Sequence, residues 1–507
     1  MSQVLVKACC AVAIAIVVLA TGLIVVPATG LFELSAQAQT APPSAGQSSA
    51  ADPQSVATGG PQSNPFTAEW LVGNAVSDAG SPQYKDVNEA ITRFHNTDVA
   101  GARELLVRAR QSNPKLPPVE VMMGRLWAAA NQINAARNEL EKSVVTNPTD
   151  PEAYLFFAEV ALADHRITDA EAILQKTKPI IDAYNENLKR KRNFQIRFNS
   201  GMAAVSEGRS QWDAAIPYFK AWLELDPDNV VAHQRLGRTL FQLGKTTEAY
   251  NEFDTALKID PKTVNPYIAL AEMYEQAKDR PNASKSIGYA VQKNPKDLAV
   301  HLQAARWAMV TNQLNEAQRY ADKALQIDPK SLEAKILRGG IARFTGDLKT
   351  AETYLEQAVA QAPANIDASN QLALVLADQD DKDKKDRALQ IAELNLRATT
   401  QGDRANPEIA ATYAWALYRL GRTAEAEQLL GKIFSAGAIS PDTAYYVGRI
   451  LQDRGKTDNA IKVLESALAS PNPFAQRQAT TELLAQLKKE QSKNADKGGS
   501  APASDNK

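Results

Sequence analysis

Residues 230–263 read VVAHQRLGRTLFQLGKTTEAYNEFDTALKIDPKT, and the spacing of their apolar residues indicates how the chain folds. Its second half places Ala249, Phe253 and Ala256 at i, i+4 and i+7, which is one face of a helix. Pro261 cannot continue that helix, and it also keeps the preceding residue out of helical backbone angles. The stretch therefore predicts two amphipathic helices joined by a tight turn and closed at the proline.

The same unit recurs with a period of 34 residues from about Gln83 to about Phe474. An Asp-Pro or Asn-Pro dipeptide closes many of the units, with the prolines at 114, 148, 227, 261, 295 and 329. A fixed period of this size is typical of a solenoid, in which each repeat buries its apolar face against the next. A solenoid offers a long groove to another chain rather than an enclosed catalytic pocket.

The pattern resembles the tetratricopeptide repeat (TPR) family, whose units are helical hairpins of 34 residues. An alanine followed by a large apolar residue recurs along the chain, as in Ala102/Leu106, Ala136/Leu140, Ala170/Leu174, Ala215/Phe219, Ala283/Ile287, Ala351/Leu355, Ala426/Leu430 and Ala460/Leu464. The resemblance implies an all-α fold, a right-handed superhelical solenoid of about eleven TPR hairpins with a C-terminal capping helix. It also implies that the partners are other proteins or extended peptides.

Composition divides the chain into six predicted segments. The small and polar residues of the linker and the tail cannot bury enough apolar surface to fold. The predicted segments are a signal peptide or N-terminal membrane anchor (1–38), a disordered linker (39–65), an N-terminal cap segment (66–82), the TPR solenoid (83–474), a capping helix (475–492) and a disordered tail (493–507).

The N-terminal segment predicts export in a bacterial type of cell envelope. Residues 8–26 carry no charge, and as a helix they would be about 28 Å long, close to the thickness of a bilayer core. Lys7 precedes this segment, whereas the next basic residue is Lys85, so the positive-inside rule sends the repeats to the periplasmic side. Two outcomes stay open: anchoring in the inner membrane by residues 8–26, or release after cleavage near Ala38.

Two stretches depart from the period. About eleven extra residues, 185–195, predict a lengthened helix, because three extra turns keep its apolar face in phase. This helix carries Lys189, Arg190, Lys191 and Arg192, which we interpret as a solvated face in preference to a binding patch. The charged run 378–387 predicts an enlarged surface loop.

The chain's charge and cysteine content exclude several functions. It has 57 basic and 58 acidic residues and a net charge of −1, so no basic field is available for nucleic acid. Both cysteines, Cys9 and Cys10, lie in the apolar N-terminal segment, which removes disulfides, thiolate metal sites and a cysteine nucleophile from the repeats.

The histidines predict packing rather than chemistry. His233 and His301 fall at the position that Tyr154 and Tyr267 hold in other repeats, and no H-E-x-x-H motif occurs. We therefore predict no catalytic residue, no metal site and no cofactor.

The remaining candidate site is the groove lined by the first helices of the repeats. Arginine beside aromatic residues suits carboxylates and extended peptides. The predicted partner-binding residues are Arg125, Arg238, Phe241, Arg306, Met309, Phe344, Trp415, Tyr418, Arg419, Tyr445 and Arg449. The alternative is a solvated lining in which the arginines pair with carboxylates of the same wall, such as Glu159, Glu272 and Asp453.

Together these features predict a non-enzymatic scaffold for protein–protein interaction in the bacterial cell envelope. Two alternatives stay open: an enzyme, or the targeting subunit of one, that uses groove carboxylates, and a passive structural spacer.

Overall fold

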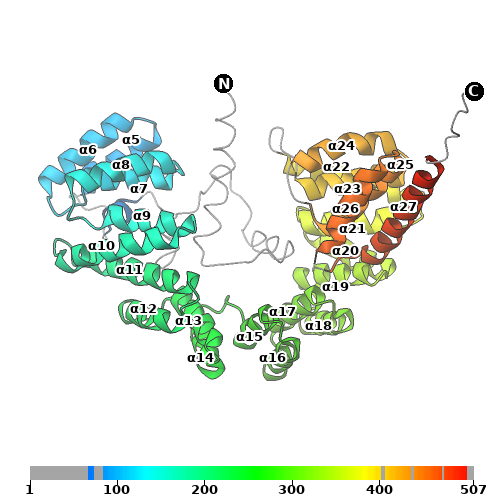
Figure 1. Ribbon diagram of the computed structural model, residues 1–507, viewed down its shortest axis with the longest axis horizontal. Coiled ribbons are helices and arrows are strands. Elements are labelled where there is room, and N and C mark those ends of the chain that lie inside the picture. The colour runs from blue at the N-terminus through cyan, green and yellow to red at the C-terminus, as the bar shows by residue number, and fades with distance from the viewer. Residues whose placement is uncertain (1–66, 74–83, 401–405, 436–438, 471–472, 499–507) are drawn as a thin grey trace, which may run out of the picture. The chain divides into compact units, whose positions relative to one another are not determined.

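The computed structural model describes residues 67–73, 84–400, 406–435, 439–470 and 473–498 (Figure 1). The predicted signal or anchor segment (1–38) and the linker (39–65) lie outside these residues. Every regular element in the described ranges is a helix, which confirms the predicted all-α solenoid. Within the described ranges, no helix has both the length and the hydropathy needed to cross a bilayer.

The contacts divide the chain into two compact units, one up to Ser286 and one from Ile287. The helices of the first unit are α4 (Ala68–Val72), α5 (Lys85–His95), α6 (Val99–Ser112), α7 (Val119–Ala129), α8 (Ile133–Thr146), α9 (Glu152–Ala163), α10 (Ile167–Ala183), α11 (Leu188–Gly208), α12 (Trp212–Leu225), α13 (Val230–Gln242), α14 (Thr246–Ile259) and α15 (Pro266–Gln276). The boundary falls within α16 (Arg280–Lys293).

The second unit contains a further run of paired helices and a long terminal one. These are α17 (Leu298–Val310), α18 (Leu314–Ile327), α19 (Leu332–Phe344), α20 (Leu348–Gln361), α21 (Ile366–Asp378), α22 (Lys382–Thr399), α23 (Pro407–Arg419), α24 (Thr423–Ser435), α25 (Pro441–Asp453), α26 (Thr457–Ala469) and α27 (Arg477–Gly498). The described helices α5–α26 thus form eleven two-helix repeats.

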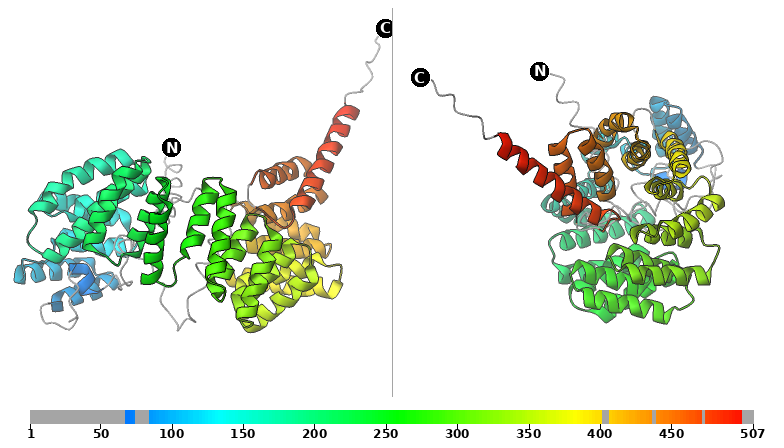
Figure 2. Two further views of the ribbon diagram at one scale, coloured as in Figure 1. Left: turned by 90° about the horizontal axis from the view of Figure 1, so that it is seen from below. Right: turned by 90° about the vertical axis from the view of Figure 1, so that its right-hand side faces the viewer.

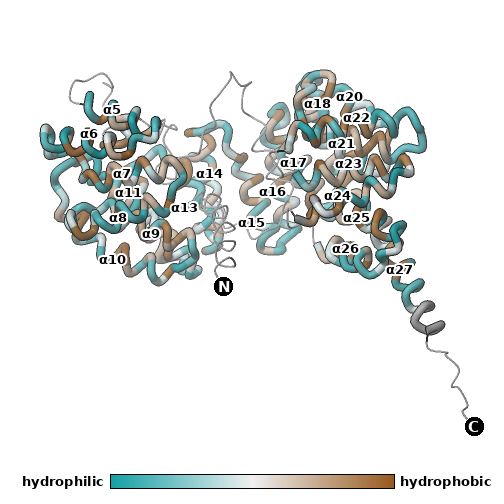
Figure 3. The backbone as a smooth tube through the Cα atoms, turned by 90° about the horizontal axis from the view of Figure 1, so that it is seen from above, coloured by the Kyte–Doolittle hydropathy of each residue, from teal (hydrophilic) through white to brown (hydrophobic). Residues whose placement is uncertain are grey.

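Within a repeat, the first helix packs against the second, as α13 does against α14 and α17 against α18. The first helices of several neighbouring repeats also pack directly on one another, for example α9 on α11 and α21 on α23. In each unit the first helices therefore line one wall, which we call the inner wall. Apolar residues alternate with polar ones along each helix, as Figure 3 shows, because one face is buried and the other is solvated.

In four of the described repeats, close contact between the two helices depends on a glycine in the first. A Cβ atom on Gly237 would lie 2.9 Å from Phe253, and one on Gly339 would lie 2.6 Å from Leu355. Gly124 and Gly448 face Leu140 and Leu464 in the same way. The large apolar residue sixteen positions later therefore fills the space that the missing side chain leaves.

The turn inside ten of the eleven described hairpins contains one residue in the left-handed backbone region, the exception being the turn between α21 and α22. This residue is glycine in several repeats, as at Gly244 (φ 74°) and Gly455 (φ 71°), but Thr97 (φ 64°) and Lys278 (φ 60°) hold the position in others. Glycine adopts this region without a steric penalty, so Gly244 can form the turn that leads into α14.

His233 and His301 have the predicted packing role, and each also contacts a proline carbonyl of the preceding turn. The Nε2 atom of His233 lies 2.9 Å from the carbonyl oxygen of Pro227, and that of His301 lies 3.2 Å from the carbonyl oxygen of Pro295. In another repeat, the hydroxyl of Tyr154 donates to the carbonyl oxygen of Pro148 at 3.4 Å. Both residue types therefore tie the first helix to the preceding turn.

The structure corrects two of the predicted boundaries. The charged run 378–387 is not an enlarged loop: α21 ends at Asp378, Asp381 caps α22 by accepting from the amide of Lys384, and α22 begins at Lys382. The terminal helix α27 also continues past residue 492 to Gly498, and it packs against α25 and α26 (Figure 2).

Candidate partner-binding surfaces

The predicted groove residues lie on the first helices, at spacings that place them on a shared face. In α13, Gln234, Arg238 and Phe241 follow one another at i, i+4 and i+7. Most of the predicted residues are half-buried, so part of each side chain faces solvent. These are Arg238, Phe241, Arg306, Met309, Phe344, Tyr418, Arg419, Tyr445 and Arg449.

Two of the predicted groove residues are buried, contrary to the expectation that they line an open groove. Arg125 is 6% exposed because α4 covers it, and it pairs with Glu152 at 2.9 Å. Trp415 is 3% exposed, and its Nε1–H donates to Asp378 at 2.8 Å. Neither side chain can reach a partner while these contacts hold.

The inner-wall arginines pair largely within the protein. Arg306 forms an ion pair with Glu333. Arg449 donates to Gln452 at 3.3 Å and to the hydroxyl of Tyr418 at 3.4 Å. This arrangement agrees with the alternative in which wall arginines find partners on the same wall, although the acceptors differ from those expected.

A buried ionic network, the N-terminal network, joins α7, α9 and α11 in the first unit. Glu152 lies at its centre, 2.9 Å from Arg125 and 2.6 Å from Arg197. Arg197 also binds Glu159 through two hydrogen bonds of 2.7 and 2.9 Å. Burial by itself would raise the pKa of Glu152, but the surrounding arginines outweigh it and hold that pKa far below its ordinary value.

Arg190 is the third arginine of this network, and its position corrects a prediction. The basic run 189–192 does not form a uniformly solvated face, because Arg190 is 1% exposed. Its guanidinium donates to Asp150 at 2.8 and 3.1 Å, and its Cζ atom lies over the ring of Phe194, 4.9 Å from the ring centroid. Lys189 and Arg192 are exposed as expected.

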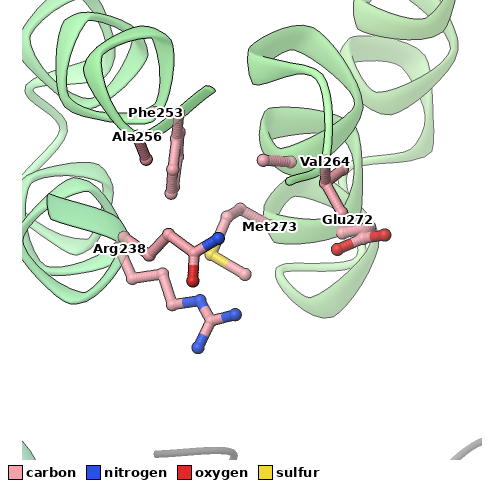
Figure 4. A pocket seen from close by; sticks show the side chains of 8 residues that line it. Arg238, Phe253, Ala256, Val264, Glu272 and Met273 are labelled. Atoms are coloured by element: carbon pink, nitrogen blue, oxygen red, sulfur yellow. The ribbon is translucent and has the colours of Figure 1, made fainter. Parts of the chain in front are cut away.

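A small pocket opens between α13, α14 and α15 of the first unit. Arg238 and Glu272 contribute its charged groups, and Phe253, Met273 and Val264 contribute apolar walls (Figure 4). Burial raises the pKa of Glu272 to about 7, although the positive charge of Arg238 opposes that rise. Glu272 is the one carboxylate among the residues that line the pocket, whereas general acid–base catalysis by carboxylates commonly uses a pair.

The titration of Glu272 gives a direct test of this pocket. Because its pKa is raised from 4.5 to about 7, the neutral form is favoured in the folded protein. The stability that this group contributes is therefore complete below about pH 4.5 and lost as the pH rises through about 7. Carboxyl ¹³C NMR should follow this titration.

Replacement of Arg238 by a neutral residue should raise the pKa of Glu272 further. In Arg238→Met we expect the pKa of Glu272 to rise above about 7, because the favourable charge is gone. Gln234→Met changes a neutral residue of the same pocket and should leave the pKa in place. An unchanged or lowered pKa in Arg238→Met would contradict this electrostatic account.

In the second unit, aromatic residues of α23 and α25 form a surface that we call the tyrosine cluster. It consists of Trp415, Tyr418, Tyr445 and Tyr446. Trp415 stacks on Tyr418, with ring centroids 5.2 Å apart, and on Tyr446, with centroids 4.7 Å apart. Tyr445 contacts Trp415 with a centroid distance of 5.9 Å. Tyr418 and Tyr445 are half-buried, so each retains an exposed part.

A buried polar layer holds this cluster in place. Arg343 donates to the hydroxyl of Tyr446 at 2.6 Å, and Gln476 donates to the Asp378 carboxylate at 3.3 Å. Burial raises the pKa of Asp378, and Arg343 offsets only part of that rise. This polar layer joins α19, α21, α25 and the residue before α27, and it therefore holds the rings of Tyr418 and Tyr445 in fixed positions.

Charged side chains flank the exposed rings. Arg419 pairs with Asp380 at 2.9 Å, and its guanidinium lies 5.8 Å from the ring centroid of Trp415. The hydroxyl of Tyr418 donates to Asp453 at 2.7 Å. The structure thus brings together five of the predicted residues, Trp415, Tyr418, Arg419, Tyr445 and Arg449, on two adjacent first helices.

Sequence reasoning missed the residues that hold these surfaces. Asp150, Glu152 and Arg197 of the N-terminal network did not stand out, because they belong to different repeats and meet only in the fold. Arg343, Asp378 and Tyr446 under the tyrosine cluster were missed for the same reason. The sequence did offer one signal: Glu152 and Glu159 are the only charged residues of the largely apolar helix α9.

The repeat geometry defines a helical-repeat solenoid with an inner wall of first helices. Family models described as tetratricopeptide repeat match residues 207–274 and 302–366. These two segments are tetratricopeptide repeats, and the other described hairpins have the same two-helix architecture. Arrays of this family are scaffolds that bind other proteins or peptides, and this chain has the architecture of such a scaffold. No curated protein matches the sequence.

Solved structures similar to the chain include other repeat proteins. Yeast Tom70 is 16% identical, with a TM-score of 0.35 over 81% of this chain and 96% of that one. A tetratricopeptide repeat protein from Parabacteroides merdae is 14% identical, with a TM-score of 0.40 over 51% of this chain and 98% of that one. TTC0263, a TPR protein of Thermus thermophilus, is 22% identical, with a TM-score of 0.27 over 37% of this chain and 99% of that one.

Proposed function

We propose that the chain is a non-enzymatic scaffold of the bacterial cell envelope that binds extended segments of partner proteins along its inner wall. The observation that carries this proposal is the tyrosine cluster. Tyr418 and Tyr445 expose aromatic surface, Arg419 and Arg449 lie beside them, and a buried layer fixes their positions. Rigid aromatic and arginine side chains are the residues that most often dominate binding energy at interfaces.

The chemistry of the surface favours a peptide over a small substrate. Aromatic faces contact apolar side chains of an extended chain, and the guanidinium groups bind carboxylates or backbone carbonyl oxygens. No pair of carboxylates converges in the Arg238 pocket, so nothing observed there favours the enzyme alternative. The spacer alternative predicts that the exposed rings bind nothing.

Photo-crosslinking in the cells that make the protein tests the proposal. A photoreactive residue at Tyr445 should form crosslinks to partner chains, because this position lies on the inner wall. One at Phe434, an exposed apolar residue of the second helix α24 (45% exposed), is the matched control and should form few or none. Equal crosslinking from both positions, or none from Tyr445, would contradict binding at the tyrosine cluster.

A pair of substitutions measures how strongly the cluster contributes. We expect Tyr418→Ala with Arg449→Glu to reduce recovery of the crosslinked partner by about tenfold or more, which corresponds to a loss near 1.4 kcal/mol. Phe434→Ala should leave recovery unchanged. Undiminished recovery with the double variant would favour the spacer alternative.

The envelope location rests on the N-terminal sequence and is tested separately. N-terminal sequencing of the protein from the membrane and periplasmic fractions should find either an intact anchor (8–26) or a new end near Ala38. Recovery of the protein in the cytosolic fraction alone would overturn the envelope assignment, while leaving the scaffold proposal intact.

A further inference from the structure

The short helix α4 is seated on the inner wall of the first repeats. It packs against α5 and α7, both of which are first helices. Its residues Ala68, Leu71 and Val72 are at most 1% exposed, and they share a core cluster with Met122 and Met123 of α7. A segment N-terminal to the repeats therefore occupies the wall on which we expect partner chains to bind.

Arg125 holds α4 by its backbone. The guanidinium Nη1 atom donates to the carbonyl oxygens of Trp70 at 2.9 Å and Leu71 at 3.2 Å. Both carbonyls lie in the last turn of α4, where the helix supplies few backbone donors. The Trp70 carbonyl also accepts from the amide of Gly73 at 3.2 Å. Gly73 then ends the helix in the left-handed region, and a Cβ atom there would lie 3.1 Å from the Cγ atom of Arg190.

The surface of α5, α7 and Arg125 that contacts α4 binds backbone carbonyl oxygens and apolar side chains. A helix that fits it needs two aliphatic residues that can be buried, an aromatic residue next to them, and a glycine at its end. Glu152 fixes the guanidinium that makes the backbone contacts, because it binds the other Nη atom of Arg125. Any short helix with this pattern can satisfy the same contacts.

The fit of α4 itself is incomplete. In the described part of the chain, the Nε1 atom of Trp70, the Oε1 atom of Glu69 and the Nε atom of Arg125 are buried without a hydrogen-bond partner. Each such buried group lowers stability relative to one that is hydrogen-bonded. Because α4 contributes five residues, few contacts offset this cost, and α4 is held less firmly than the hairpins beneath it.

We propose that the inner wall at Arg125, α5 and α7 is a second peptide-binding site, and that α4 occupies it as an internal competitor. The ligand class is a short partner helix with the aromatic–aliphatic–glycine pattern of residues 70–73. In the resting protein the occupant is α4 of the same chain. This inference rests on the proposed function in that a partner of the scaffold must displace α4 to bind here.

A peptide-binding experiment with the full chain tests this competition. The probe is a fluorescein-labelled synthetic peptide of residues 64–76, measured by fluorescence anisotropy. In the variant Leu71→Asp with Val72→Asp, α4 cannot bury its apolar face, so the peptide should bind at least about tenfold more tightly than to the parent. Adding Arg125→Ala to this variant should abolish the gain. Val145→Asp, which charges an 80% exposed valine of α8, should behave as the parent.

Two results would overturn the proposal: no binding of the peptide to the folded Leu71→Asp, Val72→Asp variant, or equal binding to variant and parent. Hydrogen exchange on the parent chain serves if the variant does not fold. The amide of Leu71, which donates to Thr67, should exchange at least about tenfold faster than the core amides of α7. Equal protection would show α4 to be an integral part of the core. Tyr445 lies in the second unit, so the crosslinking result for the proposed function does not depend on the result of this peptide-binding experiment.

Discussion

Arg190→Met should lower the stability of the first unit by about 3–5 kcal/mol, the usual cost of removing one partner from a buried ion pair. Arg190 is 1% exposed and Asp150 is 5% exposed, so the aspartate charge would remain buried without its guanidinium. The loss also removes the hydrogen bond of 2.7 Å to the hydroxyl of Tyr184. Hydrogen exchange of α9 and α11 amides is the appropriate measurement, because repeat arrays do not unfold as one two-state unit.

The adjacent residue supplies the control for this prediction. Lys189→Ala removes a positive charge from the exposed side of the same helix, and we expect a change within about 0.5 kcal/mol. Adding Asp150→Asn to Arg190→Met should restore part of the stability, because the uncompensated charge is then gone. A cost for Arg190→Met no larger than that of Lys189→Ala would contradict a stabilising role for the N-terminal network.

Phe253→Ala should destabilise its repeat by about 3–5 kcal/mol, since it removes a buried ring and leaves a cavity. Phe253 is 4% exposed, and its ring fills the space opposite Gly237, where a Cβ atom would lie 2.9 Å away. Urea unfolding followed by circular dichroism, together with hydrogen exchange of α13 and α14, measures the loss.

The other repeats indicate which replacement is tolerated at this position. Leu140, Leu355 and Leu464 occupy the corresponding place, and each faces a glycine. We therefore expect Phe253→Leu to cost less than about 1.5 kcal/mol, because leucine preserves most of the apolar volume. A cost for Phe253→Leu equal to that of Phe253→Ala would show that this interface requires the aromatic ring itself.

The repeat fold was readable from the sequence because its information is local. The proline at the end of a unit, the alanine and large apolar pair, and the glycine in the first helix all act within one hairpin of 34 residues. The lengthened helix was predictable for the same reason: α11 has 21 residues, and the insertion of about three turns preserves its buried face.

The wrong predictions concern charged residues, which can be either buried or exposed and can lie in either a helix or a loop. Arg190 and Lys189 are neighbours in a basic run, yet one is buried and the other exposed, because successive helical residues point about 100° apart. The charged run after Asp378 was predicted to form a loop from its polarity, but charged residues are good helix formers once Asp381 caps the helix.

The sequence predicted which helices carry the candidate site residues, but it did not predict which of their side chains are buried. Inner-wall spacing correctly placed Tyr418, Tyr445 and Arg449 on first helices with part of each side chain exposed. The same spacing placed Arg125 and Trp415 there, although both are buried. Their burial depends on α4 and on the polar layer around Asp378, which come from other parts of the chain.

The hairpin and the face that each helix buries could be predicted from the sequence, because both follow from residues within one or two turns of each other, and the period follows from the recurrence of that pattern. Which inner-wall residues are available to a partner could be seen only in the folded chain. That depends on which distant charges and rings meet: Arg125 with Glu152 and the carbonyls of α4, and Trp415 with Asp378. Burial of a charge is acceptable only when its partner is in place, and a linear sequence does not specify which partner that is.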